Sequence, residues 1–225
     1  MRTRKRNPTK VRLKSKTQVF DGHIDIDRYR LTHELYDGGW GALIEREVMS
    51  RGNSVAVLLF DPYRQEVVLI EQFRIGAWVA HWANPWLLEC VAGLIEPGEK
   101  STAVAIRESL EESGCSVTRL TSIANYLSTP GCSSEEIEIF CGQIDATGVG
   151  GNHGIEDEGE DIRASVWKVD DALDILDKGR ICNAMTIIAL QWLSRHRERL
   201  THHWTAEPVE FFGFDFINRE ADESN

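Results

Sequence analysis

The segment GLIEPGEKSTAVAIRESLEESGC at residues 93–115 restricts the possible fold more than any other part of the sequence. Ser101 is a good N-cap residue, and Gly114 suits the left-handed turn that follows a helix, so we expect a helix between them. Residues three and four apart share one face of a helix. This spacing predicts an apolar stripe that packs on a core, formed by Ala103, Ile106 and Leu110.

The same helix carries a cluster of carboxylates on nearly the opposite face. The cluster consists of Glu108 and, three and four residues later, Glu111 and Glu112. Like charges at that spacing repel each other, and a bound divalent cation would offset the repulsion. Oxygen ligands without His or Cys favour Mg²⁺ or Mn²⁺ over zinc. Such ions are used at phosphate-transfer sites, where they neutralise the substrate and activate water. Glu99 and Arg107 are expected to meet across the loop–helix junction and to hold its shape.

A solvated acidic face on an ordinary amphipathic helix is the competing interpretation of these glutamates. Three glutamates alone would favour it. Further charged and glycine positions stand in register with the cluster and favour a site instead: Gly93, Glu99, Arg107 and Gly114.

Composition and charge narrow the class of protein. The 225 residues, 42% of them hydrophobic, suffice for one large domain or two small ones, and no apolar run is long enough to span a membrane. Five cysteines without a C-x-x-C pair favour a reducing cytoplasm. Residues 1–16 hold eight Lys or Arg and no acid, so the net charge of −11 leaves the remainder strongly acidic. An acidic body repels polyanions, which argues against nucleic acid as a partner.

Hydrophobic periodicity predicts a mixed sheet with helices on its faces, an α/β fold. Expected strands lie at about 17–31, 43–48, 53–60, 67–72, 86–91, 117–128, 135–144 and 162–169. Besides the helix in the 93–115 segment, helices are expected near 170–178 and 183–197.

The 93–115 segment resembles the Nudix box, G-x5-E-x7-R-E-U-x-E-E-x-G-U, in which U is a bulky apolar residue. Every specified glycine, glutamate and arginine is present. Ser109 and Cys115 stand at the two U positions and depart from the pattern on its packing side. The resemblance extends from about residue 17 to about residue 199 and is greatest to the bacterial ADP-ribose pyrophosphatases. The segments that carry it are VVLIEQFR at 67–74, PWLLE at 85–89, STPGCSSE at 128–135, EDEGEDIR at 156–163 and GRICNAMTIIALQWL at 179–193.

This resemblance implies a Nudix α/β/α sandwich with a mixed sheet, preceded by a small N-terminal antiparallel β domain that is exchanged across a homodimer. The expected organisation is a basic disordered arm at 1–16, the N-terminal β domain at 17–50, the Nudix catalytic domain at 51–199 and a C-terminal tail at 200–225.

The resemblance also implies a metal site and a reaction. The expected ligands of Mg²⁺ or Mn²⁺ are the backbone carbonyl of Ala92 and the side chains of Glu108, Glu111, Glu112 and Glu160. Glu158 matches the general base, which would activate the water that attacks one phosphorus. ADP-ribose would then leave as AMP and ribose 5-phosphate.

Matching positions imply contacts with a nucleoside diphosphate sugar by His23, Ile24, Arg46, Glu47 and Arg74, and by Glu135 of the partner subunit. A guanidinium pairs well with a diphosphate, although Arg74 at a strand end also suits a surface salt bridge. Imidazole stacks on a base less extensively than phenylalanine does, so His23 leaves the nucleobase preference open.

Two alternatives to ADP-ribose hydrolysis remain. The first is a pyrophosphatase for another nucleoside diphosphate sugar, such as GDP-mannose, because residues 51–53 and 72–74 resemble that relative too. The second is a non-catalytic nucleotide sensor with a Nudix fold. Sensors of this kind typically lose glutamates of the box, whereas this sequence keeps all of them.

Overall fold

The computed structural model describes residues 7–155 and 159–206, which form two compact units. The first unit combines the chain up to Asn53 with the segment Leu127–Glu136, and the second holds Ser54–Tyr126 and the chain from Ile137 onward.

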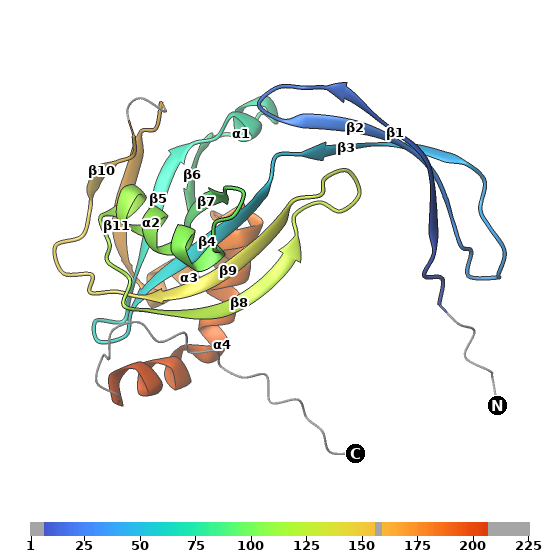
Figure 1. Ribbon diagram of the computed structural model, residues 1–225. Helices are drawn as coiled ribbons and strands as arrows, with labels where there is room; N and C mark the ends of the chain where they lie inside the picture. The colour runs from blue at the N-terminus through green and yellow to red at the C-terminus, as the bar shows by residue number, and fades with distance from the viewer. Residues whose placement is uncertain (1–6, 156–158, 207–225) are drawn as a thin grey trace, which may run out of the picture. The chain divides into compact units, whose positions relative to one another are not determined.

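The first unit is built on a three-stranded antiparallel sheet in the order β1-β2-β3, drawn in blue in Figure 1. Its strands are β1 (Val11–Phe20), β2 (Asp25–His33) and β3 (Ile44–Ser50). The predicted strand at 17–31 is therefore two strands joined by a turn at residues 21–24. Val11 to Lys16 belong to β1, whereas the sequence placed them in a disordered arm.

The segment Leu127–Glu136 joins this sheet through backbone and side-chain bonds. The Met49 N–H donates to the Cys132 carbonyl at 2.8 Å, and the Ser134 N–H donates to the Met49 carbonyl at 3.1 Å. Arg51 donates to the Glu135 carboxylate through Nε and Nη2, at 3.1 and 2.9 Å. The predicted N-terminal domain at 17–50 did not include this loop, because its attachment depends on contacts remote in sequence.

The second unit contains a mixed sheet in the order β10-β11-β5-β4-β9-β8, with β6 paired to β5 and β7 to β4. The strands are β4 (Asn53–Asp61), β5 (Glu66–Phe73), β6 (Trp86–Glu89), β7 (Val91–Ile95), β8 (Arg119–Leu127), β9 (Glu136–Gln143), β10 (Gly151–His153) and β11 (Ile162–Lys168). The helices are α1 (Ile75–Val79), α2 (Ser101–Ser113), α3 (Val169–Asp177) and α4 (Ala184–Ala206). β4 runs parallel to β9 and antiparallel to β5, as a mixed sheet requires.

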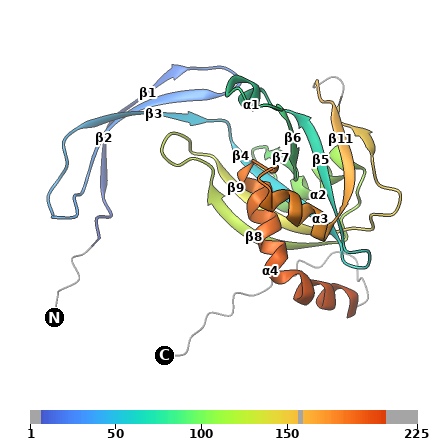
Figure 2. The same ribbon diagram turned by 180° about the vertical axis from the view of Figure 1, so that it is seen from behind.

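Two hydrophobic clusters cover the two faces of this sheet. Ala56, Leu58 and Phe60 of β4 pack with α3 and α4, whereas the alternate residues of the strand pack with α2. In Figure 1 α2 lies in front of the sheet, and in Figure 2, seen from behind, α4 lies in front. The alternation of a two-sided buried strand thus produces the predicted α/β/α sandwich.

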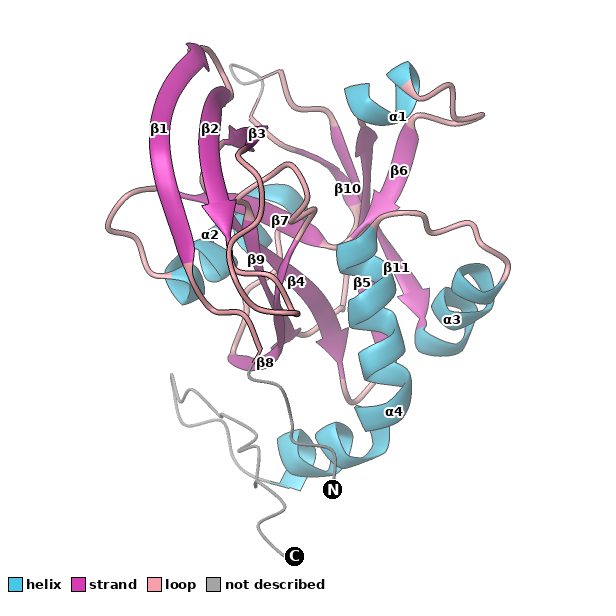
Figure 3. Ribbon diagram, turned by 90° about the vertical axis from the view of Figure 1, so that its right-hand side faces the viewer, coloured by secondary structure: helices cyan, strands magenta, loops and turns pink. Residues whose placement is uncertain are grey.

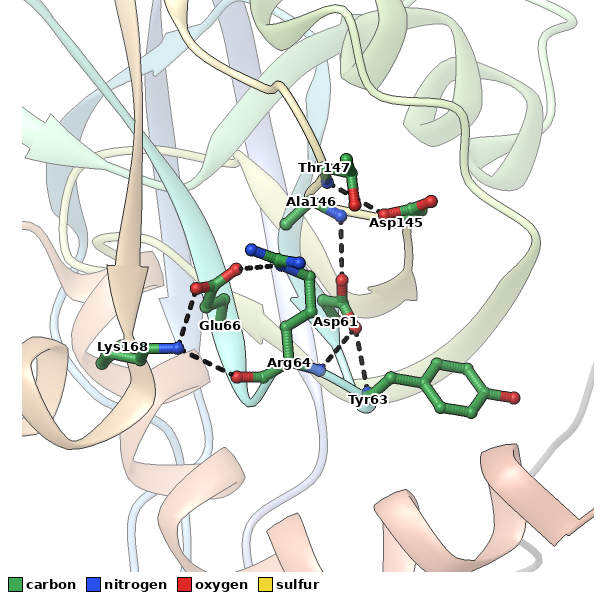
Figure 4. Close-up of polar contacts among 8 residues, drawn as sticks. All are labelled: Asp61, Tyr63, Arg64, Glu66, Asp145, Ala146, Thr147 and Lys168. Carbon is green, nitrogen blue, oxygen red and sulfur yellow. Dashed lines mark hydrogen bonds and ion pairs between the residues drawn. The ribbon is translucent and has the colours of Figure 1, made fainter.

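The turn between β4 and β5 is fixed by charged groups (Figure 4). Buried Asp61 accepts hydrogen bonds from the N–H groups of Tyr63, Arg64 and Ala146 at 2.9, 3.0 and 2.9 Å. Glu66 pairs with Arg64 at 2.8 Å and with Lys168 at 2.9 Å. The network ties the start of β5 to the end of β11 and to the loop after β9.

Three features differ from the elements that the sequence predicted. The expected strand at 86–91 is interrupted at Cys90, whose N–H donates to Thr186 Oγ1 of α4 at 2.8 Å. α4 continues to Ala206 and buries Leu200 and Trp204, which the boundary at 199 assigned to a tail. The short elements α1 and β10 were not predicted. No helix of the described residues is long and apolar enough to cross a membrane.

Candidate active site

Helix α2 carries the glutamate cluster, and its ends explain its length. Gly114 takes the left-handed conformation (φ +70°) as predicted, and its N–H bonds to the Leu110 carbonyl. Ser101 is the first helical residue rather than the N-cap; Lys100 precedes the helix and makes no side-chain cap.

The buried face of α2 is not the predicted stripe. Ala103 is exposed, Leu110 is 56% exposed, and only Ile106 packs partly on the core. The fully buried residues are small, namely Val104, Ala105 and Ser109. Ser109 Oγ donates to the Ala105 carbonyl at 2.6 Å, so its hydroxyl is buried with its hydrogen bond made. The fully buried residues of α2 are thus small, and Glu112 is the buried glutamate of the helix.

Glu112 is the most deeply placed carboxylate of the cluster, at 4% exposure. One of its oxygens, Oε2, accepts a hydrogen bond from the Ala92 N–H of β7 at 3.0 Å. Burial raises the pKa of Glu112 to about 8, the Ala92 hydrogen bond lowers it, and the negative charges of Glu108 and Glu160 raise it further. A buried carboxylate among other carboxylates is a site that favours a bound cation.

Gly93 leaves the space that the Glu108 side chain occupies. A Cβ at position 93 would lie 2.2 Å from Glu108 Oε1 and 2.3 Å from its Cδ, far inside van der Waals contact. The glycine of the box therefore permits a carboxylate to lie directly against β7. Burial raises the pKa of Glu108, and the neighbouring Arg107 lowers it.

Arg107 joins the carboxylates at the rim of the site. Its Nη1 lies 2.9 Å from Glu108 Oε1 and 3.0 Å from Glu111 Oε2. Its Nη2 lies 3.9 Å from Glu99 Oε2, and the same oxygen of Glu99 accepts the Glu96 N–H at 3.0 Å. The predicted contact between Glu99 and Arg107 across the loop–helix junction is therefore present.

Glu160 reaches the site from the loop between β10 and β11. Its backbone and side chain both bond to Ile155, with the Ile155 N–H donating to Glu160 Oε2 at 3.1 Å. Its charge raises the pKa of both Glu108 and Glu112, so the three carboxylates lie within electrostatic reach of one another. Glu158, the expected general base, lies outside the described residues.

Arg74, at the end of β5, is placed near the same cluster, and its positive charge lowers the pKa of Glu112. Its Nε and Nη2 both donate to Glu89 Oε2, at 2.8 and 2.7 Å. The strand-end salt bridge anticipated from the sequence is thus present, but its acidic partner is buried rather than on the surface, at 3% exposure. Glu89 was not singled out from the sequence, although a carboxylate that ends the apolar run WLL is costly to bury unpaired and so indicates a partner.

The donor set fits a hard divalent cation. Glu108, Glu111, Glu112 and Glu160 offer only carboxylate oxygens, which Mg²⁺ and Mn²⁺ prefer. Within residues 7–155 and 159–206, no three His, Cys, Asp or Glu side chains stand in an arrangement that could hold a metal ion. Arg107 pairs with one oxygen of Glu108 and one of Glu111, Oε1 and Oε2 respectively.

The remaining predicted substrate residues lie in the first unit. His23 is exposed and Ile24 half-buried in the turn between β1 and β2. On β3, Arg46 donates to the Glu45 carbonyl at 2.7 Å, and Glu47 pairs with Arg28 at 2.7 Å. Glu135 is buried and paired with Arg51 of its own chain.

The chain is similar to one family model and to several curated proteins. The model of the NUDIX domain matches residues 50–184. The ADP-ribose pyrophosphatase of Escherichia coli K12 is 42% identical over 194 residues, covering 86% of this chain and 92% of that protein. The ADP-ribose pyrophosphatase of Haemophilus influenzae is 38% identical over 189 residues, covering 83% and 87%.

More distant similarities extend to another substrate and to a solved structure. The GDP-mannose pyrophosphatase of Cronobacter sakazakii is 34% identical over 150 residues, covering 66% of this chain and 77% of that protein. The crystal structure of an ADP compounds hydrolase shares the fold with a TM-score of 0.63 at 21% identity, covering 87% of this chain and 98% of that one.

Proposed function

The chain belongs to the Nudix family, and from that premise we propose that it hydrolyses the pyrophosphate bond of ADP-ribose to give AMP and ribose 5-phosphate. The observation that carries this proposal is the inward-facing carboxylate cluster of α2, built on Gly93 and the Ala92 N–H. Two relatives that cover most of the chain, at 42% and 38% identity, are named ADP-ribose pyrophosphatase.

We propose Mg²⁺ or Mn²⁺ as the cofactor, held by Glu108, Glu112 and Glu160, with Glu111 and the Ala92 carbonyl as further ligands. When bound, the ion supplies positive charge that stabilises the phosphate oxygens in the transition state. The Ala92 N–H fixes the direction of the Glu112 carboxylate. Arg107 holds the carboxylates of Glu108 and Glu111, which would be ligands of the ion.

Residues of the chain itself supply substrate binding and proton transfer in this proposal. Arg74 binds the diphosphate through charge-assisted hydrogen bonds. Glu158 accepts the proton of the attacking water as general base. His23, Ile24, Arg46 and Glu47 contact the nucleoside and sugar.

We also propose that the protein is a homodimer whose exchanged N-terminal domains bring Glu135 of one subunit toward the substrate of the other. All of β1 is exposed within its unit, including Val11, Leu13, Val19 and Phe20 at 42–63%. A three-stranded sheet gains stability when such a surface is covered. Light scattering after size exclusion, repeated across a dilution series, measures the assembly; a monomer at micromolar concentration contradicts it.

All five cysteines are unpaired, which agrees with the proposed cytoplasmic location.

A hydrolysis panel tests the activity. ADP-ribose, GDP-mannose and NADH are each incubated with Mg²⁺ or with EDTA, and the nucleotide products are separated by chromatography. We expect the highest kcat/KM with ADP-ribose, and no turnover in EDTA. Preference for GDP-mannose would establish the alternative substrate, which the 34% identical relative supports. Absence of hydrolysis of all three substrates would favour a nucleotide sensor.

The matched pair of variants is Glu112→Gln and Glu138→Gln. Glu138 lies on β9, outside the carboxylate cluster, and its substitution should leave turnover unchanged. Glu112→Gln removes the buried carboxylate and should lower kcat by at least about 100-fold.

A further inference from the structure

Arg74 is held at both its backbone and its side chain. Its N–H donates to the Pro85 carbonyl at 2.9 Å, and its own carbonyl accepts the N–H groups of Ala77 and Trp78 at 3.0 and 3.1 Å. The latter two residues belong to α1, which lies at the same end of the sheet as the start of β6 (Figure 3). The main chain of Arg74 is therefore fixed, and the orientation of its guanidinium depends on the residue with which the side chain pairs.

That partner, Glu89, is a buried carboxylate on the face of the sheet that packs on α2. Glu89 stands directly opposite Ile70 in the antiparallel pair of β6 and β5, so the two side chains share a face. Ile70 belongs to the hydrophobic cluster that includes Val104 and Ala105 of α2. Glu89 therefore points toward the layer that carries the box glutamates.

Glu89 is itself fixed by the first residues of the α4 region. Burial raises the pKa of Glu89, while Arg74 and a hydrogen bond from Asn183 lower it. Asn183 also accepts the Thr186 N–H through Oδ1 at 2.9 Å, and Thr186 Oγ1 accepts the Cys90 N–H. The interruption between β6 and β7 is thus anchored to α4 on the residue that follows Glu89.

The pairing leaves part of the guanidinium free to bind an anion. A guanidinium has five N–H donors in a planar fork, and Glu89 engages one on Nε and one on Nη2, which leaves three. No other hydrogen-bond acceptor contacts the Arg74 guanidinium among the residues that the structure describes, and its side chain is 40% exposed. Glu89 precedes Ala92 by three residues, and the Ala92 N–H binds the Glu112 carboxylate. The positive charge of Arg74 also lowers the pKa of Glu112, so the guanidinium is within electrostatic reach of the carboxylate cluster.

We propose that Glu89 is a positioning residue, which holds the Arg74 guanidinium so that its free N–H donors bind the diphosphate of the substrate. This inference rests on the proposed pyrophosphatase function. Glu89 contacts neither substrate nor metal in this proposal and acts only through Arg74, because its carboxylate is bound by the guanidinium and by Asn183.

A double-mutant cycle tests the coupling. Glu89→Gln keeps the shape of the side chain but presents an N–H₂ group to a donor, so Arg74 loses its orientation. We expect KM for ADP-ribose to rise about tenfold in Glu89→Gln and in Arg74→Gln, with kcat within about twofold, because the interaction is made equally in ground and transition states. The double variant should be no worse than Arg74→Gln alone.

Glu66→Gln is the matched control. It also removes a buried carboxylate that pairs with an arginine, but at the opposite end of β5. At the usual rise per residue of a β-strand, the Cα atoms of Glu66 and Phe73 are about 23 Å apart. The KM of Glu66→Gln should equal that of the parent protein. Equal KM values in Glu89→Gln and the parent, additive effects in the double variant, or a KM rise in Glu66→Gln would each overturn the proposal.

A second variant and a binding measurement complete the test. If Glu89→Gln does not fold, Glu89→Asp keeps the charge but shortens its reach, and should raise KM by a smaller factor. Binding of α,β-methylene ADP-ribose by calorimetry repeats the cycle on Kd without turnover. Tight binding by the parent without hydrolysis of ADP-ribose would reject the proposed function and leave this inference standing on the Kd cycle; absence of binding would reject both.

Discussion

At the scale of single residues, the site is defined by where side chains are absent as much as by where they are present. Gly93 has no steric need for its own backbone, since its φ is not in the left-handed region, yet a methyl group there would overlap three atoms of Glu108. The overlapping atoms belong to a flexible side chain, so substitution should displace Glu108 rather than unfold the chain.

Gly93→Ala should therefore separate stability from activity. The free energy of unfolding should fall by no more than about 1 kcal/mol, because Glu108 can rotate away. The kcat should fall about 100-fold, because a misplaced ligand loses the productive geometry. Urea denaturation and steady-state kinetics measure the two quantities. The variant Gly93→Ala/Glu108→Gln should be no slower than Glu108→Gln alone; a further loss would show that Gly93 acts elsewhere.

The pKa of Glu112, raised by burial to about 8 from an ordinary 4.5, predicts a pH-dependent stability. The Glu112 carboxyl group binds its proton more tightly in the folded state than in the unfolded state. Its contribution to the free energy of unfolding is therefore fully present below pH 4.5 and is lost as the pH rises through 8. In EDTA, the Tm of the parent protein should fall from pH 5 to 9 relative to that of Glu112→Gln, which cannot ionise. Parallel Tm curves for the two proteins would contradict the assignment.

At the scale of elements, the C-terminal end of α2 could be predicted better than its faces. Gly114 marks the helix end because only its lack of a Cβ makes the left-handed turn inexpensive, which is a local property of the sequence. The buried face depends on how closely the helix approaches the sheet. Apolar periodicity favoured Leu110, whereas the structure buries Ser109, whose hydroxyl is satisfied within the helix itself. Periodicity counts apolar residues and does not register a polar group that bonds to its own backbone.

Gly114→Ala should weaken the C-terminal end of α2. A Cβ in the left-handed conformation costs about 1–2 kcal/mol. The added Cβ would also lie 3.1 Å from Cε1 of His153 on β10. Gly131→Ala is the control, since its φ is not positive and no atom lies within 4 Å of an added Cβ. Chemical denaturation should show a loss of about 1–2 kcal/mol in the first variant and none in the second.

At the scale of the whole molecule, the last turns of α4 complete the hydrophobic core of the second unit. Trp204 is fully buried, and its ring lies 6.2 Å from that of Phe60 on β4. The predicted boundary of the catalytic domain at residue 199 follows the extent of the family resemblance, and the polar run from Arg195 to Arg199 gives no sign that the helix continues. Only the packing of remote strands reveals that the helix continues.

Trp204→Ala should lower the free energy of unfolding by about 3–5 kcal/mol, the usual cost of removing a buried aromatic side chain. Trp82→Ala provides the comparison, since Trp82 is 54% exposed and should change stability by less than about 1 kcal/mol. Equal losses in urea denaturation would show that Trp204 does not anchor α4.

The general architecture followed from the sequence because alternation and helix periods are local signals. The strands at 53–60, 67–72 and 162–169 correspond to β4, β5 and β11. The break at Cys90, the attachment of Leu127–Glu136 and the pairing of Arg74 with Glu89 were missed, since each depends on a partner at least 15 residues away.

The first unit is assembled from two stretches of chain that are separated by more than seventy residues. This division of the first unit matters for the construction of chimaeras between relatives. A graft of the amino-terminal sheet that leaves the host's own loop in place keeps the ion pair of Arg51 only where the host has an acid in the position of Glu135, so the two pieces are best transplanted together.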